Sequence, residues 1–174
     1  MQDLYRKCLE ISRKTIVEYR DNNNVPDLSY YESDEDLMEK KGLYITFFDR
    51  ETGNILARRG HMTSDRELLY NIRDMTVAAY NKIREYEDRL QIGITFISDL
   101  KAHKKKDRLD LNGKGLYIQY FEKSATLLPD EIGEDENPED VVARLCRKKG
   151  FSPQLYREGN LLLFTYNTET VRES

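Results

Sequence analysis

The sequence predicts an α+β fold, in which a mostly antiparallel sheet of five to six strands is flanked by about three main helices. Apolar residues recur at helical spacing over residues 1–20, 65–84 and 138–149. The segments between them alternate like strands and are joined mostly by hairpin turns. Regular alternation of strand and helix with glycine-rich turns is missing, which argues against a doubly wound parallel sheet.

The first helix is amphipathic. Leu4, Cys8 and Ile11 follow one another at spacings of four and three, and they predict a buried stripe. An Asp-Asn-Asn-Asn run and Pro26 end the helix. Residues 21–41 are polar and acidic, so we expect a loop with one short helix, the most mobile segment of the chain.

The next prediction is a hairpin over residues 43–59. Residues 43–48 are apolar on both faces, which is typical of a central strand that is covered on both sides. Residues 49–54 have turn chemistry, with Gly53 supplying a positive φ. We expect this hairpin to lie next to the alternating strand at 91–98.

A helix is predicted to follow the hairpin. Ser64 and Glu67 have the spacing of a capping box, and the apolar stripe that follows runs to about Arg84. Later strands are expected at 116–121 and 161–166.

The remaining elements lie in the second half of the chain. A turn is predicted at 123–124, and the basic run 101–108 is expected to be a solvated turn or short helix. Asn137 and Pro138 open a capped helix that Gly150 ends in the left-handed conformation. Residues 168–174 are polar and are expected to fray.

Composition narrows the class of protein. The chain has 174 residues, enough for one domain with a core, and we expect a single domain over 1–174. Its formal charge of −4 disfavours general nucleic-acid binding. No apolar run approaches the roughly 20 residues of a membrane span, and the charged residues 1–20 do not resemble a signal peptide. We therefore expect a soluble cytoplasmic protein.

Cysteine and histidine are scarce. Cys8 and Cys146 each lie within an apolar helical pattern and are interpreted as buried, unreactive side chains without a disulfide. A zinc site needs three or four clustered ligands, and two histidines and two distant cysteines do not supply them, so no metal and no cofactor is expected. The G-x-S-x-G motif of esterases is also missing, and catalytic residues stay unknown.

Several segments in order resemble the AMMECR-one domain family. The family has a Gly-Val-Phe-Val-Thr strand, an Arg-Gly element, an Ile-Glu-Val-Ser-Val-Leu strand, a glycine-led strand, Leu-Leu-Pro, and a helix ending Leu-Cys-x-Lys-Ala-Gly. The corresponding segments here are 42–46, 59–60, 91–100, 115–118, 127–129 and 145–150. The resemblance covers about residues 1–167.

The chain departs from the family at its hallmark. The family's Arg-Gly-Cys-Ile-Gly reads Arg59, Gly60, His61, Met62 and Thr63 here, so histidine replaces the cysteine. The family's Asp-Pro-Arg-Phe segment is also missing. The chain is therefore a divergent member, and any function tied to that cysteine does not carry over.

The resemblance implies an α+β fold with a smaller subdomain, but no assigned activity. Prokaryotic members resemble partners of Memo-like and radical-SAM proteins, so such proteins are expected partners by resemblance alone.

Arg59, Gly60, His61 and Ser64 form the candidate site. Gly60 supplies a bend, Arg59 a cation and His61 a titratable ring, and a helix is expected to begin at Ser64. Together these features favour binding of a small anion or contact with a partner. The alternative is structural: Gly60 is a bend, Arg59 pairs with an acid, and His61 packs as a polar residue.

Three functions stay open. We favour a binding or adaptor module. The alternatives are an enzyme of unknown chemistry that uses the Arg59–His61 junction, and an RNA-binding protein that uses the run 101–108. Acidic net charge disfavours the last, and loss of the hallmark cysteine disfavours thiol catalysis.

Overall fold

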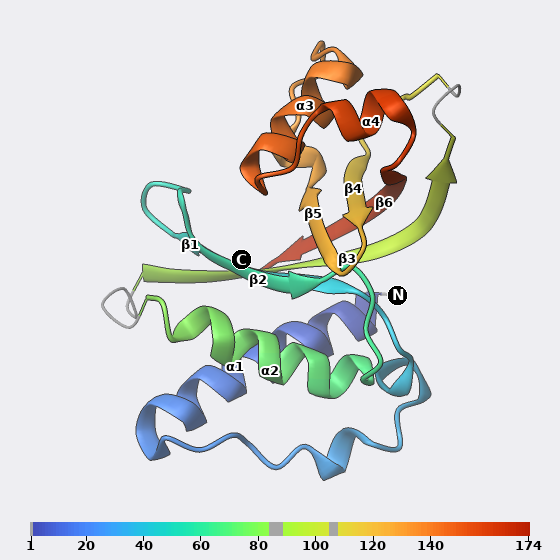
Figure 1. Cartoon of the computed structure of the whole chain (residues 1–174). Helices are drawn as coiled ribbons and strands as arrows, with labels where there is room; N and C mark the ends of the chain where they lie inside the picture. Colours follow the sequence, from blue (N-terminus) through green and yellow to red (C-terminus); the bar gives the residue numbers. More distant parts are fainter. Residues whose placement is uncertain (1, 84–88, 105–107) are drawn as a thin grey trace. The chain divides into compact units, whose positions relative to one another are not determined.

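A computed structural model describes residues 2–83, 89–104 and 108–174 (Figure 1). In the described residues, one sheet holds six strands in the order β2 (Ile55–His61), β1 (Leu43–Asp49), β3 (Leu90–His103), β6 (Leu162–Arg172), β4 (Gly115–Tyr120) and β5 (Lys123–Leu127). This confirms the predicted α+β class and the predicted number of strands. The chain divides into two compact units, Met1–Phe96 with Glu169–Ser174, and Ile97–Thr168. Each unit has its own apolar cluster.

The first unit packs two helices on a sheet. Helices α1 (Gln2–Asn22) and α2 (Leu68–Tyr80) lie on the same side of the strands β1 (Leu43–Asp49) and β2 (Ile55–His61) (Figure 1). Strand β1 is central, antiparallel to β2 and to β3 (Leu90–His103), and is buried along most of its length. The predicted adjacency of the hairpin and the third strand is thus confirmed.

The acidic segment 21–41 differs from the prediction. It holds two short 3-10 helices, η1 (Ser29–Tyr31) and η2 (Glu35–Met38), instead of one. Leu37 is fully buried, and the Lys7 ammonium lies 2.8 Å from the Asp34 carboxylate. Leu28 and Leu37 are buried in the apolar cluster of the first unit and so attach this segment to it. The polar composition of the segment did not indicate these contacts.

Helix α2 begins later than predicted, so the expected capping box is wrong. Glu67 is the N-cap residue without a side-chain bond, and the Ser64 hydroxyl accepts the Arg66 N–H at 3.1 Å instead. The reason is tertiary: the Leu68 N–H donates to the Glu39 carbonyl at 2.7 Å. A neighbouring segment therefore satisfies the first helical donor. The helix also ends earlier than the predicted end at about Arg84, because Tyr80 is its last residue and Asn81 is its C-cap.

The second unit contains β4 (Gly115–Tyr120), β5 (Lys123–Leu127), α3 (Pro138–Lys148) and the short α4 (Gln154–Glu158), which the sequence did not predict. The turn predicted at 123–124 instead falls at Phe121, whose φ is 52°, and β5 begins at Lys123.

Helix α3 has both predicted ends. The Asn137 side chain accepts the Glu139 N–H at 2.9 Å. Gly150 has a φ of 72°, and the Phe151 N–H reaches back to the Cys146 carbonyl at 2.8 Å. This is the bond pattern of a Schellman motif, in which glycine avoids Cβ strain.

Two strands are longer than predicted. Strand β3 continues to His103, so the start of the basic run is strand and not a turn or helix, while residues 105–107 lie outside the described part. Strand β6 (Leu162–Arg172) extends into the tail, so the prediction that residues 168–174 fray is wrong. The Glu173 N–H donates to the Ile92 carbonyl at 2.9 Å, which fixes the tail to β3.

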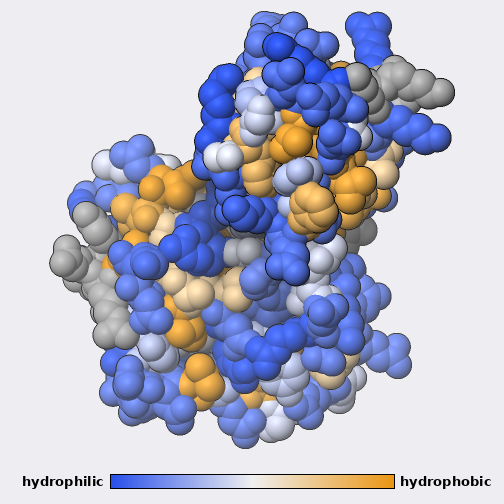
Figure 2. Space-filling model, viewed as in Figure 1, coloured by the Kyte–Doolittle hydropathy of each residue, from blue (hydrophilic) through white to orange (hydrophobic). Residues whose placement is uncertain are grey.

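Hydrophilic residues cover most of the visible face of the molecule, and apolar residues gather in a few small groups (Figure 2). Among the described residues, the most exposed large apolar or aromatic side chains include Tyr30, Phe121 and Leu162, which are 86%, 79% and 58% exposed. They are far apart in the sequence.

Candidate functional site

The junction predicted as a site lies at the end of β2. Arg59 and His61 are exposed there, and Gly60 and Ser64 are half-buried. The Arg59 guanidinium donates to the Arg58 carbonyl at 2.7 Å. Arg59 thus extends along its own strand, and the structure brings the four residues together only as neighbours in sequence.

Gly60 has a clear structural role. A Cβ on Gly60 would lie 2.1 Å from the Leu43 carbonyl oxygen and 2.6 Å from the Tyr44 Cα. A Cβ on Gly42 would lie 2.0 Å from the Met62 carbonyl oxygen. The two glycines therefore let β1 and β2 approach more closely than side chains permit.

The helix N-terminus that was expected to attract an anion does not lie at this junction. The N-terminus of α2 is not at Ser64 but at Leu68, and the Leu68 N–H is already bonded to Glu39. The helix donors that the prediction assigned to an anion are thus separated from Arg59 by eight residues of chain. A contact through Arg59, Gly60, His61 and Ser64 stays a prediction.

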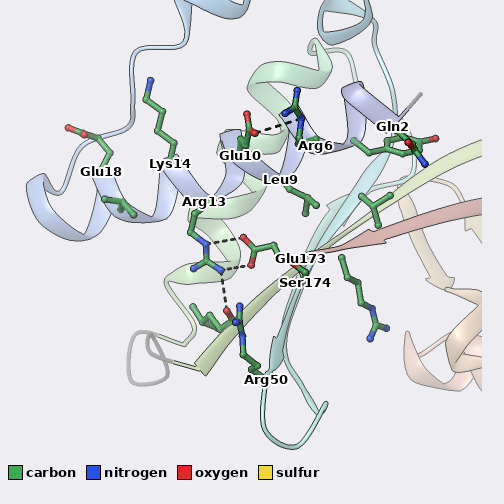
Figure 3. Close-up of a pocket in the computed structure, with 15 residues that line it drawn as sticks. Gln2, Arg6, Leu9, Glu10, Arg13, Lys14, Glu18, Arg50, Glu173 and Ser174 are labelled. Carbon is green, nitrogen blue, oxygen red and sulfur yellow. Dashed lines mark hydrogen bonds and ion pairs between the residues drawn. The ribbon is translucent and has the colours of Figure 1, made fainter.

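A groove lies elsewhere in the first unit, between α1 and the end of β6 (Figure 3). We call it the α1 groove; its volume is about 1080 Å³. Its apolar lining includes Leu9, Val17, Leu90 and Val171. Val17 is 41% exposed although it is aliphatic, so the groove offers apolar surface to a ligand.

Basic side chains outnumber acidic ones in the α1 groove. Five basic residues line it: Arg6, Arg13, Lys14, Arg50 and Arg172. Three acidic residues line it: Glu10, Glu18 and Glu173. This local excess of positive charge contrasts with the net charge of −4 of the chain.

The basic residues are not equivalent. Arg6 is paired with Asp3, and the Arg172 guanidinium stacks 3.8 Å from the centre of the Phe48 ring. The exposed Arg50 guanidinium has no hydrogen-bond or ion-pair partner within the described segments and lies at the same end of the groove as Arg13 (Figure 3). Arg50 is therefore the cation best placed to bind an incoming carboxylate.

Glu173 forms one wall of the groove and is firmly bound. Its carboxylate accepts hydrogen bonds from both sides of the Arg13 guanidinium and from the Ile92 N–H at 2.9 Å. Arg13 also donates to the Leu90 carbonyl at 3.1 Å, and Gln91 donates to the Glu173 carbonyl at 2.7 Å. Figure 3 shows the pairing, which joins α1 to the end of the chain.

Tyr5 also lines the α1 groove. Its hydroxyl donates to the Glu169 carboxylate, and its ring stacks on Phe96 with 5.1 Å between ring centres. The hydrogen bond to Glu169 raises the pKa of Tyr5 to about 12, so the phenol stays protonated at neutral pH. Tyr5 is therefore a neutral donor.

The sequence did not indicate the α1 groove. One wall is formed by residues 171–174, whose polar composition predicted that they fray. The other side is the exposed face of α1. The one available signal was Val17, an aliphatic residue outside the main apolar stripe of that helix.

Both cysteines are buried and free, as predicted. Burial raises the pKa of Cys8 to about 12 and raises the pKa of Cys146 as well. Within the described parts, no three His, Cys, Asp or Glu side chains cluster as metal ligands would.

We expect both thiols to resist a thiol reagent in the folded protein, because they are protonated and inaccessible. Labelling in native buffer should be more than about 100-fold slower than in denaturant. The measurement is the absorbance of the released reagent over time. Fast labelling of one thiol in native buffer would show that its helix opens readily.

The fold and the groove define an α+β protein with a mostly antiparallel six-stranded sheet and a ligand-accessible surface along its first helix. A model of the AMMECR1 family matches residues 9–171, and the chain belongs to this family, as the resemblance predicted.

Solved structures share the fold. The crystal structure of the uncharacterized protein PH0010 from Pyrococcus horikoshii superposes with a TM-score of 0.81 at 16% sequence identity, covering 96% of this chain and 90% of that chain. No curated protein matches. Among the helices of the described residues, none combines the length and apolar character that membrane crossing requires.

Proposed function

We propose that this AMMECR1-family chain is a binding module, and that the α1 groove holds a segment of a partner protein with both acidic and apolar side chains. The observation that carries the proposal is the combination of exposed Val17 with the free guanidinium of Arg50 in one groove. Apolar contact supplies affinity, and a charge-assisted hydrogen bond supplies selectivity.

The chemistry of the groove favours an acidic segment over a basic one. A carboxylate near Arg50 gains a bidentate partner, and the Glu173 carboxylate nearby is already neutralised by Arg13. A lysine in the same place would face the excess of basic side chains. Glu173 is already satisfied by Arg13 and Ile92, so it offers little to an incoming cation.

The family resemblance suggests which proteins to test first. Memo-like and radical-SAM proteins are the proposed partners, and acidic surface segments on them are the proposed occupants. The exposed Arg59 and His61 on β2 are a second candidate contact. Neither enzymatic chemistry at that junction nor RNA binding has a specific observation in its favour.

The experiment measures fluorescence anisotropy of two labelled peptides with the same leucines. One peptide carries Asp and Glu, and the other carries Lys in their place. We expect the acidic peptide to bind and the basic one to bind at least about tenfold more weakly, because charge complementarity sets selectivity. Equal binding of the two peptides, or binding of neither, would refute the proposal.

Two charge-reversal variants locate the contact. Arg50→Glu should weaken acidic-peptide binding about tenfold or more, since an attraction becomes a repulsion. Arg157→Glu makes the same charge change on exposed α4 and should leave binding within about twofold. If Arg59→Glu abolishes binding while Arg50→Glu does not, the docking surface is the β2 junction and the groove assignment is wrong.

A further inference from the structure

The second unit holds a separate pocket beside the end of β3. Its volume is about 260 Å³, and it is more enclosed than the α1 groove. His103 and Lys104 form one side, and Tyr156 and Gly159 form another. Typical small-molecule pockets measure roughly 300–1,000 Å³, so this one suits a compact ligand.

The imidazole of His103 has a fixed position at this pocket. Its Nε2 lies 2.7 Å from the hydroxyl of Thr165, which is only 3% exposed on strand β6. A buried hydroxyl on a paired strand cannot follow a moving ring, so the bond sets the orientation of the imidazole. An anchored ring in a cavity wall is pre-organised for a ligand.

The floor of the pocket is rigid and apolar. Leu109, Leu161 and Leu163 line it and belong to the buried cluster of the second unit. Gly159 ends α4 with a φ of 78°, a conformation that favours glycine, and it adds no side chain to the pocket. A ligand with an apolar part therefore gains contact with side chains that are already packed.

The polar lining favours negative charge. His103 and Lys104 are basic, and none of the described lining residues is an aspartate or glutamate. Burial raises the pKa of Tyr156, with a smaller contribution from Glu139, so its phenol remains a neutral hydrogen-bond donor. A histidine, an ammonium and a phenol thus surround one apolar floor.

We propose that this pocket binds a small organic anion, a carboxylate or phosphate ester whose apolar part lies on the leucine floor and whose charge meets His103 and Lys104. The inference is independent of the proposed peptide groove, because the residues belong to the other unit. His103 and Lys104 belong to the basic run 101–108, so the proposal also gives this part of the run a role other than RNA binding.

The test is a backbone amide chemical-shift titration of the full chain with benzoate, phenyl phosphate, inorganic phosphate and benzylamine. We expect benzoate or phenyl phosphate to shift residues 156–163 with roughly millimolar affinity, the strength that a fragment-sized ligand reaches. Inorganic phosphate should bind at least about fivefold more weakly because it lacks an apolar part. Benzylamine should leave these amides unmoved.

Matched variants tie the response to the pocket. Lys104→Glu should weaken anion binding at least about fivefold, and Lys149→Glu, an exposed change after α3, should leave it within about twofold. Both substitutions are on the surface, so a folded spectrum is expected from each.

Several outcomes would overturn the inference. Benzylamine shifting residues 156–163 as strongly as benzoate would show that charge is not recognised. Silence of those amides toward every anion would show that the pocket is unused. A short RNA that shifts residues 101–104 when the small anions do not would assign this surface to nucleic acid.

Discussion

Replacing Glu173 with alanine is expected to lower the free energy of unfolding by about 1.5–3 kcal/mol. The carboxylate accepts two bonds from Arg13 and one from the Ile92 N–H, and it is mostly shielded, with 16% of the side chain exposed. Its removal leaves a guanidinium and an amide without their partner, which costs more than the loss of an exposed ion pair. Urea denaturation followed by circular dichroism measures the change.

Arg6→Ala is the matched control. Arg6 lies on the same helix and pairs with Asp3, but both side chains are more than half exposed. We expect a change below about 0.5 kcal/mol for this variant. Equal, small effects of Glu173→Ala and Arg6→Ala would mean that the tail is not fixed in solution, and that the wall of the α1 groove forms only transiently.

Gly60→Ala is expected to destabilise the fold by about 2–4 kcal/mol. The added Cβ would meet the backbone of Leu43 and Tyr44, which cannot move without separating β1 from β2. Backbone is a harder obstacle than the end of a flexible side chain. Thermal and urea unfolding measure the loss.

Gly133→Ala is the control for this substitution. A Cβ there would have only Glu136 side-chain atoms nearby, at 3.6 Å or more, so we expect little change in the free energy of unfolding. If Gly60→Ala is as stable as Gly133→Ala, the close approach of β1 and β2 is wrong. The glycine of the family hallmark would then need a functional explanation instead of a structural one.

Local patterns predicted much of the fold. The capped start of α3 at Asn137 and its glycine end at Gly150 are present because cap and C′ residues act on the hydrogen bonds of their own helix. The hairpin pairs with the strand at 91–98 as predicted, because a strand that is buried on both faces lies inside a sheet and has a partner strand at each edge.

Local sequence patterns predicted the candidate site less well than the fold. Arg59, Gly60, His61 and Ser64 were singled out because an expected helix start lay beside them, but that start depends on the Glu39 carbonyl, far away in the sequence. The four residues therefore remain a predicted contact, and the structure adds the α1 groove as a surface that the sequence did not indicate.

By itself, the sequence determined the α+β class, the buried cysteines and the ends of α3, because these depend on periodicity and on bonds between near neighbours. It also indicated the family, through segments that resemble the family's own in the same order. Only the tertiary structure decided the start of α2, the order of the tail and the position of the groove. Glu173 looks like an exposed acid in a polar terminus, and only Arg13 and Ile92, brought to it by folding, make it part of a wall. A contact between residues 160 positions apart produces no local sequence pattern, so it cannot be predicted from the spacing of residues.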